Sequence, residues 1–514
     1  MKCNMKTLLK IVGLVWSLCL AVFVHGQSPQ TYLVSDFNEE EFGKVMELCH
    51  QGGFEYLLHR YPFSSYGHYG WNPSFASKGN RSVASMVNKA AERGVKLGVY
   101  AQMDAVSTND AYFSSRYFSQ LSRLGQVDLL CEITADQTEL TVHRNDVLNI
   151  PSTLNLLLIG KELITYGTLE PVGDLMLLHH CNRGLYGTKS VAHKVSEPVY
   201  KLWDSPERFC APDGDLIDSV RLRLTERLDA VGISFMERSD QGGHLLLNES
   251  QRVKNVERWE QEYEERNPND QPMQLGWCQV RVSDRMQPST ALHEVEWFLA
   301  KAAAYHAGYG MLVSRGVMER YGQLDRVMEL VKRWNRLRDS GLLTEEQKES
   351  LRDPYADWHL EPFDDTHYLL FPLQVSRRYR CRYELSADGL GVAEPWEWKS
   401  EDGGQFGLCI QVEGKGEIVN PEIETENGVL RFPCVIKANQ FLWYDYEDKA
   451  VVTDLNYHTI AEVIPEGDAT LPFGASQVSF RFNNKDKTKR PEVSVRYILR
   501  ETPMVFEIPS ETEE

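Results

Sequence analysis

The chain has 514 residues, of which 42% are hydrophobic and 25% are charged. These proportions are typical of globular proteins, and they exclude a disordered chain, a collagen-like fibre and a multi-pass membrane protein. With 55 basic and 74 acidic residues the formal net charge is -19, which disfavours non-specific binding of nucleic acid because such binding needs a cationic surface. The length corresponds to roughly three domains.

The first 26 residues have the pattern of a secretory signal peptide. Lys2, Lys6 and Lys10 form a basic start, and an apolar run follows from Ile11 to Val24, which is shorter than the roughly 20 residues of a membrane-spanning helix. We expect cleavage after Gly26, with an uncleaved membrane anchor as the alternative. Loss of three lysines would change the net charge from -19 to -22. The mature protein is therefore predicted to be secreted or periplasmic, with no transmembrane segment.

Cysteine and histidine spacing gives no indication of a metal site. Ten cysteines are scattered singly, without a CxxC pair, so we interpret most of them as small buried hydrophobic residues, with one or two disulfides left open. His179, His180 and Cys181 are adjacent, and neighbouring residues of a strand point to opposite faces. We expect no bound metal and no cofactor.

An alternation of strands and helices occupies residues 27–125 and resumes over residues 204–350. Short apolar strands are expected at 32–34, 54–58, 95–101, 231–236, 245–247, 273–280 and 309–313. Amphipathic or capped helices are expected at 38–50, 82–93, 216–228, 253–265, 291–306 and 323–338. Strands and helices that alternate in this way predict right-handed parallel βα units.

Seven such strands favour an α/β fold of the (β/α)8-barrel type, with one unit degenerate. The alternative is an open doubly wound sheet, but no glycine-rich phosphate loop follows the first strand.

Between the two halves of the predicted barrel, residues 126–203 form short alternating strands, and we expect an inserted small β module. Its segments Ile159–Tyr166 and Cys181–Gly184, with Gly187, Thr188 and His193, resemble a compact β module found in phage tail proteins and in some secreted carbohydrate-active proteins. Arg183 and His193 are expected to shape the turns of this module rather than to act in catalysis.

The last part of the chain, residues 351–514, is predicted to be a β-sandwich. Strands at 368–371, 379–383, 407–412, 429–432, 441–444 and 478–482 are separated by Gly, Asn and Asp. Trp396, Trp398, Trp443 and Tyr444 are expected to be buried in the sandwich, with stacking on sugar as the alternative.

In a (β/α) barrel the active site lies at the C-terminal ends of the strands, and polar and aromatic side chains gather in the corresponding loops of this sequence. The loop after the second strand is the richest, with aromatic rings that can stack on sugar and polar groups that can bind hydroxyls. The predicted substrate-binding residues are His59, Arg60, Tyr61, Tyr66, His68, Trp71, Asn72, Gln102, Asn248, Arg281 and Arg315.

Four carboxylates follow predicted barrel strands: Asp104, Glu237, Asp240 and Glu249. Hydrolysis of a glycosidic bond uses two carboxylates that flank the bond. We favour Glu237 as the nucleophile or base, with Asp104 or Glu249 as the proton donor.

Several segments together resemble secreted, glycoside-hydrolase-like barrel proteins of polysaccharide-degrading bacteria. They are GFEYLLHRYPFSSYGHYGWN, RGVKLGVYAQ, VGISF, LGWCQVR, the inserted module and VEGKGEIVNP. In similar barrels a carboxylate comes directly after the fourth strand, whereas Met236 has that position here and Glu237 follows it. A shift of one residue along a strand reverses the side-chain direction.

Two functions remain open. The first is an exported carbohydrate-active protein, a glycoside hydrolase that acts on a polysaccharide or oligosaccharide, and the second is an inactive barrel that binds glycan or scaffolds a surface complex. An exported structural protein is a third, less specific alternative. The expected partner is a carbohydrate and not a nucleic acid, and the sequence does not determine the oligomeric state.

Overall fold

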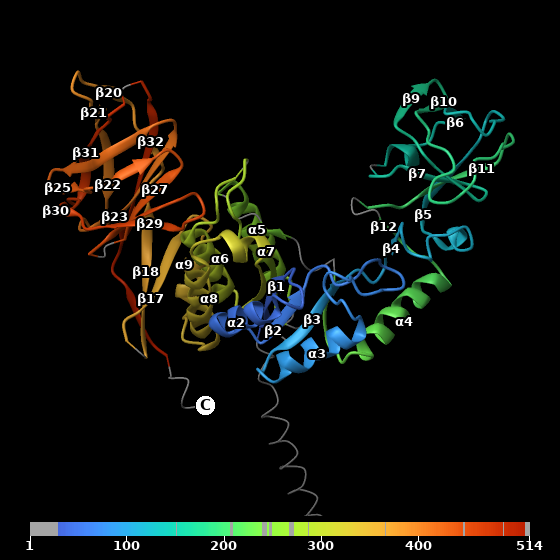
Figure 1. The fold of residues 1–514 in the computed structure, drawn as a ribbon, viewed down its shortest axis with the longest axis horizontal. Helices are drawn as coiled ribbons and strands as arrows, with labels where there is room; N and C mark the ends of the chain where they lie inside the picture. The colour runs from blue at the N-terminus through green and yellow to red at the C-terminus, as the bar shows by residue number, and fades with distance from the viewer. Residues whose placement is uncertain are drawn as a thin grey trace, which may run out of the picture. The chain divides into compact units, whose positions relative to one another are not determined.

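The computed structural model describes residues 29–150, 152–205, 209–238, 244–245, 249–266, 272–285, 287–364, 366–445, 448–486 and 488–508. The predicted signal peptide lies outside these residues. The described chain divides into two compact units (Figure 1): one comprises Val34–Met46 and Glu55–Gly242, and the other comprises the described residues up to Leu33, Glu47–Phe54 and Gly243–Glu514. The division passes through β1 (Thr31–Ser35) and α2 (Phe42–Gly52).

The α/β part of the unit that contains Glu55–Gly242 has three parallel strands in the order β13-β3-β2. They are β2 (Tyr56–His59), β3 (Lys96–Ala101) and β13 (Phe235–Arg238), and the helices are α3 (Asn80–Ala91) and α4 (Asp215–Asp229). Each helix buries one face, through Val83 and Met86 in α3 and through Val220 and Leu224 in α4. This is the amphipathic pattern that the sequence predicts.

The strand predicted at 231–236 begins later than expected. Gly232 adopts a positive φ of 78°, and the amide of Ile233 donates to the carbonyl of Leu228 at 3.1 Å. Residues 230–233 therefore complete the C-terminal cap of α4, in a conformation that glycine adopts without strain. As a result β13 starts at Phe235, and Glu237 lies inside the strand rather than after it.

The α/β part of the other unit has three parallel strands in the order β16-β15-β14. They are β14 (His244–Leu245), β15 (Gln274–Gln279) and β16 (Gly308–Leu312). The helices are α5 (Glu249–Glu264), α6 (Leu292–Ala304), α7 (Arg315–Arg320), α8 (Leu324–Asp339) and α9 (Glu345–Arg352). Trp259, Trp277, Trp297 and Trp334 are fully buried in this part.

The structure thus has mixed α/β character, with a strand at or near each of the seven expected positions. Among the described residues each unit has an open row of parallel strands, so the closed (β/α)8 barrel is not confirmed.

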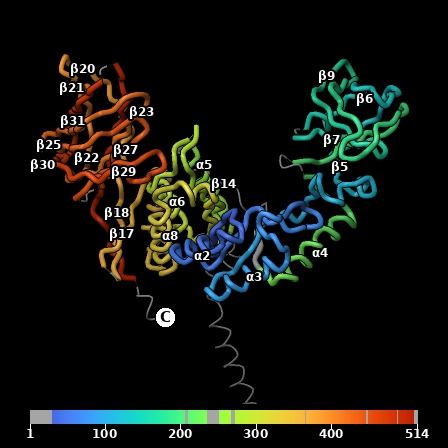
Figure 2. The backbone as a smooth tube through the Cα atoms, in the orientation of Figure 1, coloured from blue at the N-terminus to red at the C-terminus, as the bar shows by residue number. Residues whose placement is uncertain are grey.

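The inserted region is an antiparallel β module with its own core (Figure 2). Leu157, Ile159 and Ile164 pack in this core with Val142 and Val199. The short strands β4 (Val106–Ser107) and β12 (Phe209–Cys210) pair on either side of the insertion. One sheet contains β5 (Arg123–Asp128), β11 (Pro198–Leu202), β7 (Leu156–Ile159) and β8 (Glu162–Thr165), and the other contains β6 (Leu140–His143), β10 (Leu175–His179) and β9 (Thr168–Val172). Two 3-10 helices accompany them, η1 (Phe118–Gln120) and η2 (Asp146–Asn149).

The C-terminal part consists of two antiparallel sheets that share one buried core. Ile410 from one sheet and Phe480 from the other are both fully buried there. Of the four aromatic residues predicted to be buried, Trp398 lies in this core, whereas Trp396, Trp443 and Tyr444 are only partly buried. The first sheet contains β17 (Asp357–Pro362), β18 (His367–Val375), β19 (Tyr379–Arg380), β23 (Phe406–Gly414), β27 (Gln440–Tyr444), β28 (Ala450–Thr453), β29 (Thr459–Val463), β32 (Pro491–Arg500) and β33 (Met504–Glu507). The second contains β20 (Tyr383–Leu385), β21 (Leu390–Ala393), β22 (Trp396–Ser400), β24 (Glu417–Thr425), β25 (Gly428–Arg431), β26 (Val435–Lys437), β30 (Glu466–Asp468) and β31 (Gly474–Asn483).

Contacts between α6 and β17 join this sandwich to the helices of the same unit, and Figure 1 shows them side by side. Glu296 of α6 accepts hydrogen bonds from the amide of Leu360, at 3.1 Å, and from Nδ1 of His359, at 2.9 Å. The amide of Gly322 donates to the carbonyl of Asn456 at 2.8 Å.

The eight cysteines from Cys49 onward are all free thiols. Burial raises the pKa of Cys49, Cys210 and Cys409 to about 12, so these thiols behave as small apolar groups. Within the described ranges, no helix is long and apolar enough to cross a membrane.

Candidate functional site

The candidate site of the first unit is built on β2, β3 and β13, which run parallel and end at one edge. His59 is opposite Val99, and Glu237 and Arg238 are opposite Tyr100 and Ala101. The segments that follow these strands therefore leave the sheet at the same edge, as parallel pairing requires. This edge brings together Gln102, Asp104 and the backbone of Glu237.

The loop after β2 is a packed aromatic cluster. The ring of Phe63 stacks on Trp71, with centroids 5.1 Å apart, and meets Tyr69 edge to face at 5.1 Å. Tyr69 is fully buried, and the indole Nε1 of Trp71 donates to Oδ1 of Asn80 at 2.6 Å. Most of the ring surface in this loop therefore stabilises the loop itself.

His59 fixes the start of the same loop through hydrogen bonds to the backbone. Its Nε2 donates to the carbonyl of Phe37 at 2.8 Å, and its Nδ1 accepts from the amide of Tyr61 at 3.2 Å. Burial lowers the pKa of His59 to about 3, against the opposing effect of the hydrogen bond to Phe37. The imidazole is therefore neutral, and both of its nitrogens are engaged by the chain.

Among the predicted binding residues of the loop, the more accessible ones are Arg60, Tyr61, Tyr66, His68 and Asn72. The guanidinium of Arg60 lies over the ring of Tyr61, 4.7 Å from its centroid, and Tyr61 is 48% exposed. Of the predicted ligand-binding residues in this loop, these five present surface to solvent, whereas His59 and Trp71 are buried.

Asp110, which the sequence analysis missed, joins the loop after β2 to the loop after β3. Its carboxylate accepts from Oγ of Ser65 at 2.7 Å, from Nδ1 of His68 at 2.7 Å and from the amides of His68 and Tyr112. Burial raises the pKa of Asp110, but these hydrogen bonds outweigh it and lower the pKa below its ordinary value. Gly67 has a φ of 124°, and a Cβ there would lie 2.6 Å from Oδ1 of Asp110. The sequence could not indicate this arrangement, because the segment 65–68 and Asp110 are far apart in the chain and form no recognisable local pattern.

The structure describes some of the predicted catalytic carboxylates fully and others only in part or not at all. Asp104 is exposed and forms an ion pair with Arg221 of α4, whose Nη2 lies 2.8 Å from Oδ1. Tyr69 donates its hydroxyl to the carbonyl of Gln102 at 2.7 Å, which anchors the start of the Asp104 loop. Glu237 is in β13, with its side chain outside the described part. Asp240 and Asn248 also lie outside the described residues.

Besides Asn248, three predicted site residues belong to the other unit. Glu249 is the first residue of α5, and its side chain is not described. Arg281 follows β15, and in the described structure its Nε and Nη1 are buried without a hydrogen-bond partner. Arg315 is the first residue of α7.

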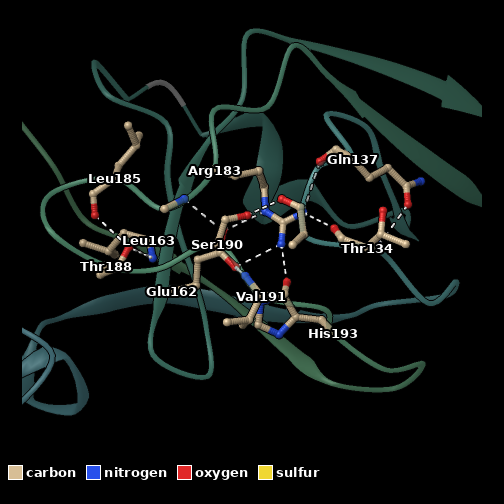
Figure 3. Close-up of polar contacts among 12 residues, drawn as sticks. Thr134, Gln137, Glu162, Leu163, Arg183, Leu185, Thr188, Ser190, Val191 and His193 are labelled. Carbon is tan, nitrogen blue, oxygen red and sulfur yellow. Dashed lines mark hydrogen bonds and ion pairs between the residues drawn. The ribbon is translucent and has the colours of Figure 1, made fainter.

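The inserted module contains a buried ionic centre (Figure 3). Glu162 accepts from Nε of Arg183 at 2.7 Å, from Nε2 of His193 at 2.9 Å and from the amides of Gly184 and Val191. Arg183 also donates to the carbonyls of Thr134, Gln137 and Val191. The centre thus ties together the loops of the module, which agrees with the structural role expected for Arg183 and His193.

His179 contacts two carboxylates, Glu139 at 2.9 Å and Glu170 at 3.0 Å. In the portion of the chain that the structure describes, no three or more His, Cys, Asp or Glu side chains are arranged so that they could hold a metal ion.

Comparisons with known proteins give remote structural neighbours that are glycoside hydrolases. The GH36 α-galactosidase AgaA from Geobacillus stearothermophilus is 11% identical with a TM-score of 0.27 and coverage of 89% of this chain and 56% of the enzyme. An α-galactosidase from Lactobacillus brevis is 9% identical with a TM-score of 0.31 and coverage of 90% and 56%. The chain therefore spans just over half the length of these galactosidases.

An α-amylase from Geobacillus thermoleovorans is 8% identical, with a TM-score of 0.33 and coverage of 88% of this chain and 98% of the enzyme. No protein-family model matches the chain, and no curated protein matches it.

Proposed function

We propose that the protein is an exported carbohydrate-active enzyme, a glycoside hydrolase that acts on a polysaccharide or oligosaccharide with two carboxylates. The observation that carries the proposal is the register of β3 and β13. Glu237 is level with Tyr100, and Asp104 follows β3 by three residues at the same edge. A carboxylate on one strand and a carboxylate in the loop that follows the neighbouring strand can flank one glycosidic bond.

In this proposal Glu237 acts as the nucleophile or base, because it is held on a strand. The proton donor is Asp104, which belongs to the same unit as Glu237. The sugar meets the accessible side chains beside this edge, namely Arg60, Tyr61, Tyr66, His68 and Asn72. Aromatic and guanidinium faces pack against sugar rings, and polar groups set the orientation.

The second candidate is a protein that binds glycan without hydrolysing it. The ion pair between Asp104 and Arg221 favours this alternative, because it occupies one of the two candidate carboxylates. The variant Arg221→Gln discriminates between the two functions. If Asp104 is the donor, release of Asp104 from the ion pair changes the pH profile of hydrolysis, whereas a binding protein shows no turnover with either form.

The experiment is an assay of reducing-sugar release from a panel of glycans, with the mature chain beginning at Gln27. The variants Glu237→Gln and Asp104→Asn are compared with Glu226→Gln. Glu226 is an exposed acid on α4 that contacts Arg223 at 3.5 Å, so it is a matched control for loss of one negative charge. Saturable binding of glycan without turnover would support the second candidate. The mass of the exported chain tests cleavage after Gly26.

A further inference from the structure

A cavity lies in the unit that contains the sandwich, and none of the residues that line it belongs to the proposed catalytic site. It has a volume of about 470 Å³, within the range of roughly 300–1,000 Å³ that is usual for small-molecule sites. Its walls are the outer face of β23, β27 and β32, the start of α6, and Arg252 of α5.

The sheet contributes a regular grid of side chains to this cavity. Cys409 is opposite Trp443 on one side and Arg496 on the other, and Gln411 is opposite Phe441 and Ser494. All six line the cavity. Residues that alternate with them, such as Ile410, pack in the core between the two sheets. The six side chains therefore share the face of the sheet that is turned away from the core.

Among the described residues, this grid has buried polar atoms without a hydrogen-bond partner on Gln411, Ser494 and the indole nitrogen of Trp443. Gln411 is 6% exposed and Ser494 is 4% exposed. Nε2 of Gln411 donates to Oε1 of Glu413 at 3.0 Å, so the side-chain oxygen of Gln411 is the atom that accepts no hydrogen bond. Among the described residues, neither this oxygen nor Oγ of Ser494 has a hydrogen-bond partner. Buried polar atoms are normally paired, so both atoms indicate a ligand that brings hydroxyl groups.

The charges around the cavity favour an anion. Arg252, Arg378 and Arg496 line it, together with Glu294, and the charge of Arg252 is balanced by an ion pair with Asp357 at 2.9 Å. His293 is neutral, because burial and these three arginines lower its pKa to about 3. Burial also raises the pKa of Glu294, and its carboxylate is engaged by the amide of Ala291 at 2.9 Å. The positive end of the 13-residue helix α6 adds to the cationic field.

Aromatic rings form the remaining wall. Trp443 is 5.9 Å from Phe441 and 5.9 Å from Tyr457, measured between ring centroids. The cavity thus combines an aromatic wall, the guanidinium groups of Arg378 and Arg496 beside the paired guanidinium of Arg252, and the unpaired polar atoms of Gln411, Ser494 and Trp443. This combination fits a ligand with an apolar ring face, hydroxyl groups and a carboxylate.

We propose that this cavity binds an acidic sugar, with its carboxylate recognised by the arginines and its hydroxyl groups by Gln411 and Ser494. The ligand is a free uronic acid or the uronic acid residue of an oligosaccharide. Binding here does not depend on hydrolysis at the strand edge, so failure of the proposed function leaves this proposal standing.

The test is isothermal titration calorimetry of the mature chain with D-glucuronate, D-galacturonate, neutral D-galactose and inorganic phosphate. We expect saturable binding of at least one uronate, with no binding of galactose. Arg378→Gln is the main variant, because Arg378 is exposed and its loss leaves the core intact. It should weaken uronate binding by about tenfold or more, since hydrogen bonds to a charged group are the strong ones.

Arg377→Gln is the matched control. Arg377 is the neighbouring exposed arginine, lies over Tyr379 at 5.1 Å and does not line the cavity. Uronate binding should be unchanged in Arg377→Gln and weaker in Ser494→Ala, while thermal melting shows that all variants are folded. Absence of uronate binding, an equal loss in both arginine variants, or phosphate binding as tight as uronate binding would each overturn the proposal.

Discussion

The buried carboxylate of Glu162 organises the inserted module, and its replacement by glutamine should destabilise the module strongly. Its side chain is 0% exposed, against 5% for Arg183 and 4% for His193. Glu162→Gln keeps the shape of the side chain but removes the negative charge with which Arg183 forms its ion pair. Loss of one partner of a buried ion pair costs about 3–5 kcal/mol. We therefore expect the free energy of unfolding of the module to fall by about this amount.

Hydrogen-exchange mass spectrometry of the full mature chain measures this change directly, through the protection of peptides from β7, β8 and β11. The control is Glu170→Gln, which removes a 60% exposed carboxylate from its contact with His179 in the same module. An exposed pair contributes about 1 kcal/mol or less. Equal loss of protection in the two variants would refute the reasoning, as would full protection in Glu162→Gln.

Because of the ionic centre formed by Glu162, Arg183 and His193, we also expect the stability of the module to depend on pH in the acid range. Burial raises the pKa of Glu162, but hydrogen bonds from Arg183 and His193 outweigh it and lower the pKa below the ordinary value of 4.5. A carboxyl with a lowered pKa stabilises the fold above its unfolded pKa, and this contribution is lost as the pH falls through the folded value. Protection of the module should therefore decline below about pH 4.5 in the wild type, and Glu162→Gln should lack this component.

Two further predictions concern the junction of α6 and α8 with the sandwich. Burial lowers the pKa of His359, but the charge and the hydrogen bond of Glu296 outweigh it and raise the pKa from 6.5 to about 10. This contact should therefore stabilise the unit fully below pH 6.5 and be lost as the pH rises through about 10; a melting temperature that responds to alkaline pH equally in His359→Gln would contradict this. Gly322→Ala should destabilise the unit by about 1–3 kcal/mol, because a Cβ there would lie 2.5 Å from the carbonyl of Tyr457. Chemical denaturation measures the loss, and Gly316→Ala is the control because its Cβ would meet only side-chain atoms, the nearest being the end of Arg320 at 3.2 Å.

The regular elements could be predicted from the sequence because local signals determine them. Apolar stripes such as Leu324, Val327 and Leu330 predicted α8 closely, and alternating residues such as those of β23 predicted the strands of the sandwich. The predicted start of β13 was wrong. Residues 231–236 are apolar enough for a strand, but Gly232, with its positive φ, belongs to the C-terminal cap of the preceding helix. A glycine cap competes with strand formation, and the apolar pattern alone does not show which prevails.

The closed barrel and the burial of the aromatic loop depend on contacts distant in sequence. Tyr69 and Trp71 have the composition of a sugar platform, yet Phe63, Asn80 and the carbonyl of Gln102 engage them within the fold. Asp110 was missed because its partners in the loop after β2, Ser65 and His68, precede it by more than 40 residues. The acidic-sugar cavity was missed for the same reason: its walls come from α5, α6 and three separate strands of the sandwich.

The most direct test of the central claim is the initial rate of reducing-sugar release by the mature chain and by Glu237→Gln on each glycan that the wild type cleaves. Loss of a catalytic carboxylate removes a group that acts in the transition state, so we expect the variant to lose kcat by about a hundredfold or more while it stays folded. Glu226→Gln should retain the wild-type rate. A folded Glu237→Gln variant that hydrolyses glycan at the wild-type rate would contradict the assignment, and a wild-type chain that binds glycans but cleaves none of them would contradict the enzymatic function.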